Sequence, residues 1–161
     1  MTYNYQLFLC SSGAEANENA LKLASFHTGK KRIIAFKNAF HGRTSAAVAV
    51  TDNQNINAPL NQQQEVTFIP FNDLEKLENE LKKGDVCGVI FEPIQGVGGL
   101  DIPDDDFVIG MNTLCEKYKS CLIADEVQSG FSRSGNFFAF QQNNIKPHVI
   151  TMAKGMGNGF P

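Results

Sequence analysis

Short apolar runs alternate with polar segments along the whole chain. Such runs, bounded by turn-forming residues, are typical of buried β-strands. The pattern predicts strands at residues 7–10, 32–36, 66–70, 86–91, 121–125 and 148–153. The last two predicted strands lead to a carboxylate and to an amine, Asp125 and Lys154. An acid and an amine are therefore expected at the ends of buried strands.

The first predicted helix follows the run at residues 7–10. Ser12 and Glu15 have the spacing of a capping box, and Thr28–Gly29 ends the helical pattern. Free backbone amides at a helix start attract anions, so Gly13 and Ala14 are candidates for holding a phosphate. An ordinary capped helix without a ligand explains the same residues.

Two further helices complete a series of strand–helix–strand units. Residues 74–81 carry leucines on one face behind a cap at Asn72 or Asp73, and another helix runs through residues 111–118. This alternation predicts an α/β fold with a mostly parallel sheet and helices on both faces. In such sheets ligands bind beyond the carboxyl ends of the strands, where the acid and the amine are expected.

Asp125 and Lys154 together suit the chemistry of pyridoxal phosphate. A lysine amine binds the aldehyde of this cofactor as a Schiff base, and an aspartate beside the pyridine nitrogen keeps that nitrogen protonated. Taken singly, each residue has a plainer explanation. The aspartate is equally typical of a helix cap, a magnesium ligand or a Walker-B carboxylate, and the lysine of a solvated turn.

The turn after the second predicted strand carries further candidates. Phe40 is placed to lie flat on a cofactor ring, and Arg43 has the planar fork that binds a carboxylate through two hydrogen bonds. A packed phenylalanine and a solvated arginine are the structural alternatives, and His41 is expected to be a structural hydrogen bonder. Glu92, at the end of its own strand, is a candidate for holding a substrate amine or neutralising Arg43, with helix capping as the alternative.

The composition is that of a single globular domain, with 161 residues of which 42% are hydrophobic. A net charge of −3 and a pI near 5.6 provide no electrostatic argument for nucleic acid or for an anionic membrane, so small solutes are the expected partners. Cysteines at 10, 87, 115 and 121 lack CxxC spacing, which favours a reducing cytoplasm. Neither a membrane span nor a signal peptide is predicted, and residues 104–106 look like a helix start rather than a metal site.

Motifs along nearly the whole chain resemble, in this order, the fold-type I, class III aminotransferases of the ornithine-aminotransferase subgroup. The matching residues are 12–18, 36–44, 92–96, 125–130 and 153–155. The resemblance implies a transferase fold that depends on pyridoxal 5'-phosphate (PLP). Residues 1–161 would form the central part of the PLP-binding large domain, with the family's amino-terminal segment and carboxy-terminal small domain absent.

The resemblance also implies a role for each candidate near the cofactor. Lys154 would carry the Schiff base and shuttle a proton, while Asp125 would pair with the pyridine nitrogen. Gln128 would contact the phenolic oxygen of the ring, and Phe40 would stack on the ring. The phosphate would be held by Gly13 and Ala14.

Substrate roles follow from the same likeness. Arg43 would bind the substrate α-carboxylate, and Glu92 would act beside it and help the site accept two different substrates. The implied reaction moves the δ-amino group of N-acetylornithine to 2-oxoglutarate, which becomes glutamate, in a ping-pong step of arginine biosynthesis carried out by a homodimer. 4-Aminobutyrate and N-succinylornithine are the alternative donors, and a non-catalytic fragment is an alternative of a different class.

Two residues depart from the family pattern. Ser11 stands where asparagine is common, and Ser132 stands where glycine is usual. We expect both to be tolerated, although serine at 132 would be costly if the backbone there needed a positive φ.

Overall fold

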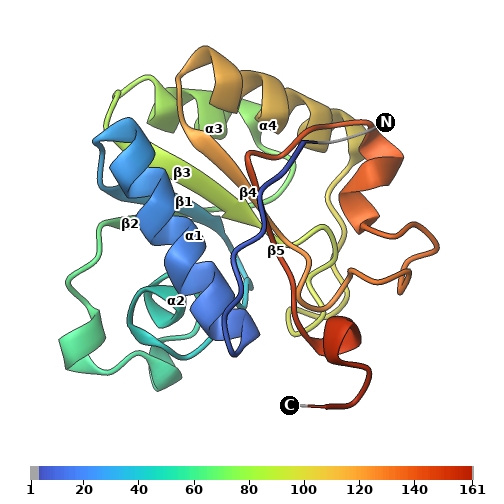
Figure 1. The fold of residues 1–161 in the computed structure, drawn as a ribbon. Helices are drawn as coiled ribbons and strands as arrows, with labels where there is room; N and C mark the ends of the chain where they lie inside the picture. Colours follow the sequence, from blue (N-terminus) through green and yellow to red (C-terminus); the bar gives the residue numbers. More distant parts are fainter. Residues whose placement is uncertain (1–3, 161) are drawn as a thin grey trace.

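The computed structural model describes residues 4–160 and contains one five-stranded sheet. All four strand pairs are parallel, and the strand order is β2-β1-β3-β4-β5 (Figure 1). The strands are β1 (Arg32–Phe36), β2 (Val66–Ile69), β3 (Val86–Phe91), β4 (Cys121–Asp125) and β5 (Val149–Thr151). The prediction of a mostly parallel sheet is confirmed.

Helices cover both faces of the sheet, as the alternating pattern predicted (Figure 1). One face is covered by α1 (Gly13–Thr28) and α2 (Ser45–Ala49), and the other by α3 (Leu74–Leu81) and α4 (Asp105–Lys117). Four short 3-10 helices complete the described part of the chain. These are η1 (Gln54–Ile56), η2 (Pro59–Asn61), η3 (Ala139–Asn143) and η4 (Lys154–Gly157).

The two faces are built from alternate residues of each strand. In β1, Ile33 belongs to the cluster beneath α1, whereas Phe36 belongs to the cluster beneath α3 and α4. The Phe36 ring lies 4.7 Å from that of Phe71 and 5.7 Å from that of Phe107, measured between centroids. Burying a side chain of this size stabilises the fold by about 1.5–3 kcal/mol.

Helix α1 begins and ends where the sequence predicted. The Ser12 hydroxyl accepts a hydrogen bond from the Glu15 amide at 3.1 Å, and Gly29 ends the helix with φ +69. The Glu15 carboxylate reaches one residue further back than in a standard capping box, because it accepts the amide of Ser11 at 2.6 Å. The start of α1 is thus held by two reciprocal bonds.

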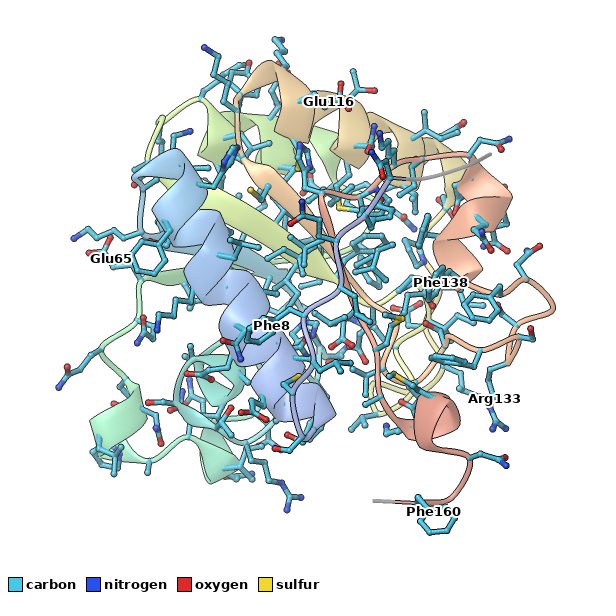
Figure 2. The ribbon with its side chains drawn as sticks, viewed as in Figure 1. Phe8, Glu65, Glu116, Arg133, Phe138 and Phe160 are labelled. Carbon is cyan, nitrogen blue, oxygen red and sulfur yellow. The ribbon has the colours of Figure 1, made fainter. Side chains whose placement is uncertain are left out.

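The predicted strand at residues 7–10 is wrong. Leu7, Phe8 and Leu9 are about 70% exposed and belong to none of the five strands. Figure 2 shows the Phe8 side chain outside the sheet. An apolar run becomes a strand only where a neighbour supplies hydrogen bonds and cover, and the described residues provide neither along this segment. The last predicted strand is also shorter than expected, since β5 covers only Val149–Thr151.

One loop and the lengths of the helices bear on sequence expectations. Ser132 has φ +64 and Phe131 has φ +58, so the turn that contains the serine does require a positive φ. Among residues 4–160, no helix is both long and apolar enough to cross a membrane.

Candidate active site

Asp125 ends β4 with its carboxylate buried on the α1 side of the sheet, where only 4% of the residue is exposed. Its Oδ2 accepts hydrogen bonds from Asn17 Nδ2 at 2.7 Å and from His41 Nδ1 at 2.8 Å. Its Oδ1 accepts the Val127 amide at 3.0 Å. Such a carboxylate is expensive to bury and needs these donors, which tie together three separate parts of the chain.

Asn17 and Thr151 were not among the candidates from sequence. The Thr151 hydroxyl donates to Asn17 Oδ1 at 2.7 Å, and Asn17 Nδ2 also donates to the His41 carbonyl at 2.7 Å. An asparagine one turn into an amphipathic helix, on its apolar side, was the available signal. Its partners lie too far away in sequence to be identified from the pattern. His41 is a buried hydrogen bonder, as expected.

Lys154 lies just beyond the strand next to Asp125. In the sheet Asp125 is paired with Thr151, and Lys154 follows Thr151 by three residues as the first residue of η4. Its φ of +36 falls in the left-handed region, which a non-glycine residue seldom adopts. Backbone strain of this kind concentrates at functional sites. Its exposed side chain is available to a ligand.

Glu92 directly follows β3 and is buried, with 4% exposure. Its Oε2 accepts the Phe40 amide at 3.0 Å. The pKa of Glu92 is raised to about 7, with burial as the largest cause and the negative charge of Asp125 as a smaller one, whereas electrostatic interactions with His41 and Lys154 and the Phe40 hydrogen bond act in the opposite direction. Asp125 and Lys154, the acid and the amine identified from sequence, therefore both influence the pKa of Glu92.

The start of α1 lies between the segments that leave β4 and β5. A Cβ atom on Gly13 would lie 2.7 Å from a methyl of Val127 and 3.3 Å from the methyl of Ala153, so only glycine allows this approach. Figure 1 shows the start of α1 and η4 at the same edge of the sheet. The amides of Gly13 and Ala14 belong to the first helical turn, which has no intrahelical acceptor for them.

The turn that carries Phe40 and Arg43 is fastened to α1. The Glu18 carboxylate accepts the hydroxyl of Thr44 at 2.8 Å and the amides of Ala46 and Ala47 at 2.9 and 3.0 Å, and so caps α2 in place of a local side chain. Phe40 is half-buried, and Arg43 is exposed. Within residues 4–160 no ion pair joins Arg43 to Glu92, the pairing considered from sequence.

Gln128 lies over the turn that follows β3. A Cβ atom on Gly96 would come within 2.0 Å of Gln128 Oε1, so the absence of a side chain at 96 makes room for this amide. The segment beneath Gln128 is held by buried Glu126, which accepts the Ser129 hydroxyl at 2.6 Å and the Phe140 amide at 2.9 Å. The exposed Gln128 side chain is thereby carried on a rigid support.

The residue types gathered at this edge fit PLP. A buried carboxylate, a free amine and a helix start with unbonded amides match the cofactor's pyridine nitrogen, aldehyde and phosphate. His41 Nε2 is buried and has no hydrogen-bond partner within residues 4–160. A buried ring nitrogen of this kind is more typical of a functional site than of a packed core.

Comparison with known families agrees with this chemistry. The family described as Aminotransferase class-III matches residues 1–161. This chain belongs to the class-III aminotransferases. An acetylornithine aminotransferase from Halalkalibacterium halodurans is 43% identical over an alignment of 157 residues, and the match covers 96% of this chain and 40% of that relative. A succinylornithine transaminase from Photorhabdus laumondii subsp. laumondii is 41% identical over 169 residues, covering 99% of this chain and 41% of the relative.

Solved structures of transaminases share the fold. An ornithine aminotransferase from Toxoplasma gondii, with partial occupancy of PLP at its active site, has a TM-score of 0.85 and 28% identity and covers 93% of this chain and 38% of its own. An S-selective transaminase from Arthrobacter sp. has a TM-score of 0.84 and 25% identity, with 92% and 39% covered. The chain therefore spans about 40% of the length of the curated class-III aminotransferases it matches.

Proposed function

We propose that the chain is the cofactor-binding part of an aminotransferase that moves the δ-amino group of N-acetylornithine to 2-oxoglutarate. The observation that carries this proposal is the buried Asp125 carboxylate, paired in the sheet with the strand that leads directly to Lys154. Membership of the class-III aminotransferases and the name of the relative from H. halodurans support the reaction and its substrate.

The described residues account for each part of the cofactor. Asp125 would hold the pyridine nitrogen, Gln128 the phenolic oxygen, Phe40 the face of the ring, and the amides of Gly13 and Ala14 the phosphate. When bound, PLP accepts the amino group and draws electrons away from the substrate carbon that carries it. These residues belong to the start of α1, to the end of β4 and to the segments that follow β1 and β4 in the parallel sheet.

Lys154 would move the proton. Its amine is the group suited to bind the cofactor's aldehyde carbon and, once displaced by the donor amine, to take a proton from the substrate Cδ and deliver it to the cofactor's C4′ carbon. Lys154 lies three residues past β5, which pairs with the strand that ends at Asp125, and its backbone has a positive φ, so its position relative to Asp125 would be set by the sheet. That fixed placement is what repeated proton transfer requires.

Arg43 and Glu92 would select the substrates. The exposed guanidinium of Arg43 would take the α-carboxylate of N-acetylornithine. The pKa of Glu92, near 7, places this carboxyl between its charged and neutral forms at neutral pH. It would therefore accommodate a second carboxylate in one half-reaction and an uncharged chain in the other.

N-Succinylornithine is a second candidate donor, because a succinylornithine transaminase is nearly as similar to the chain as the acetylornithine enzyme. The two donors share the carboxylate that Arg43 would bind and differ only in the acyl group. Glutamate formation from 2-oxoglutarate, measured with N-acetylornithine, N-succinylornithine and 4-aminobutyrate, separates the three substrates. A clear preference for either of the last two would overturn the substrate assignment.

Cofactor attachment is tested by incubating the chain with PLP, reducing it with borohydride and locating the phosphopyridoxyl group by mass spectrometry. We expect the label on Lys154 and none after Lys154→Ala. Lys146→Ala, which removes an exposed lysine outside the site, should leave labelling unchanged. An unlabelled chain, or a label at another lysine, would contradict the proposed function and favour a non-catalytic fragment.

The remaining features of the proposal concern the setting of the enzyme. We propose that residues 1–161 are the central part of the PLP-binding large domain, and that the protein works as a homodimer in a reducing compartment such as the cytoplasm. Four free cysteines support that compartment. Analytical ultracentrifugation tests the homodimer.

A further inference from the structure

Four buried polar side chains form a connected group at the active-site edge. Asn17, His41, Asp125 and Thr151 are 1%, 2%, 4% and 3% exposed and come from α1, the turn after β1, β4 and β5. Burying polar groups costs free energy unless they are hydrogen-bonded, so a cluster drawn from four elements calls for an explanation beyond packing.

The hydrogen bonds determine which way the Asn17 amide points. Both hydrogens of Nδ2 are used, one by Asp125 Oδ2 and one by the His41 carbonyl, each at 2.7 Å. Oδ1 accepts from the Thr151 hydroxyl, also at 2.7 Å. Turning the amide over would place its oxygen against the Asp125 carboxylate and the His41 carbonyl, and both of these bonds would be lost. The Thr151 hydroxyl adds a third bond that holds the asparagine in the orientation that donates to Asp125.

The same bonds leave the two oxygens of Asp125 with different roles. Oδ2 is taken by two donors, Asn17 Nδ2 and His41 Nδ1. Since a carboxylate only accepts, His41 carries its hydrogen on Nδ1. Among residues 4–160, Oδ1 accepts only the Val127 amide within normal distance, at 3.0 Å, with the Thr151 hydroxyl 3.5 Å away and already directed at Asn17. Oδ1 thus keeps a lone pair for another donor.

We propose that Asn17 is a positioning residue for Asp125. Held by Thr151, it locks the carboxylate in the orientation that leaves Oδ1 free to accept the protonated ring nitrogen of PLP. This inference rests on the proposed function and deepens it. Its role for Asn17 is to orient the Asp125 carboxylate so that Oδ1 can accept a hydrogen bond from the cofactor.

The test follows the cofactor's ring nitrogen rather than turnover. The chain is titrated with PLP labelled with ¹⁵N in the ring, and the nitrogen chemical shift and the dissociation constant are measured for the wild type and for Asn17→Leu. Removing a hydrogen bond to a charged group should weaken PLP binding about 10- to 100-fold and shift the ring nitrogen toward its unprotonated form. Asn19→Leu is the matched control, because Asn19 lies on the same helix and donates only to the Glu15 carbonyl, at 2.9 Å.

Thr151→Val is the second variant. It keeps the side-chain shape, removes the donor that orients Asn17, and should move both readouts in the same direction by about 5- to 10-fold in affinity. Circular dichroism identifies any variant that fails to fold. If Asn17→Leu does not fold, the nitrogen shift and the affinity of Thr151→Val test the inference. Folded variants whose ring nitrogen stays protonated and whose affinity is unchanged would overturn the inference alone. A wild-type chain that gives no PLP signal would overturn the proposed function and the inference with it.

Discussion

Burial of Glu92 makes the stability of the fold depend on pH. The pKa of this carboxyl rises from an ordinary value of 4.5 to about 7, with burial as the largest cause. Between these two values the folded chain binds a proton that the unfolded chain has already released. The stability that comes from this protonation is therefore fully present below pH 4.5 and is lost as the pH rises through 7. At about 1.4 kcal/mol for each pKa unit, the loss is about 3 kcal/mol.

Glu92→Gln removes the titration while keeping the shape of the side chain. The glutamine oxygen can still accept the Phe40 amide, which the Glu92 carboxylate accepts at 3.0 Å. The variant should match the wild type near pH 4 and be more stable by about 3 kcal/mol near pH 8. Stabilities come from urea unfolding followed by far-ultraviolet circular dichroism at several pH values.

Glu116→Gln serves as the charge control. Glu116 lies on the outer side of α4, exposed to solvent (Figure 2). Its removal changes the net charge equally and should shift stability by less than about 0.5 kcal/mol at every pH. Wild-type and Glu92→Gln curves that stay parallel from about pH 5 to about pH 8 would refute the reasoning, because Glu92 would then not titrate in that window.

Other substitutions test the supports of the site. Gly96→Ala should displace Gln128 and weaken PLP binding about tenfold. The loss of stability should be small, because the new methyl would clash, at 2.0 Å, with the end of a flexible side chain. An unchanged dissociation constant would argue against a role for Gln128. Glu18→Ala leaves the first amides of α2 without an acceptor and should destabilise the fold by about 1–3 kcal/mol, with faster hydrogen exchange at Ala46 and Ala47; retained protection there would contradict it. Ser132→Gly should raise the unfolding free energy by up to about 1 kcal/mol, since φ is +64 at this residue, and a lower melting temperature would show that its strain is not released.

Local patterns were sufficient for the order and type of most elements. The helices that start at Gly13 and Leu74 are each capped by a side chain that accepts the backbone amide three residues later. Ser12 accepts the Glu15 amide, and Asp73 accepts the Lys76 amide. Parallel pairing was expected because predicted helices stand between several of the predicted strands, and in a parallel sheet Asp125, Glu92 and Lys154 fall at one edge. The same reasoning failed at residues 7–10, where local apolarity had no sheet neighbour to complete it.

The sequence alone determined the fold class, the edge where the candidate residues meet and the kind of cofactor they suit, because these depend on side-chain spacing within single elements and on the handedness of their connections. Only the tertiary structure decided how the carboxylate is held. Asn17 meets Asp125 across 108 residues and Thr151 across 134, and the raised pKa of Glu92 depends on burial by the whole fold. Contacts at such separations leave no periodic trace in the chain, since they depend on how the layers pack rather than on the spacing of neighbours.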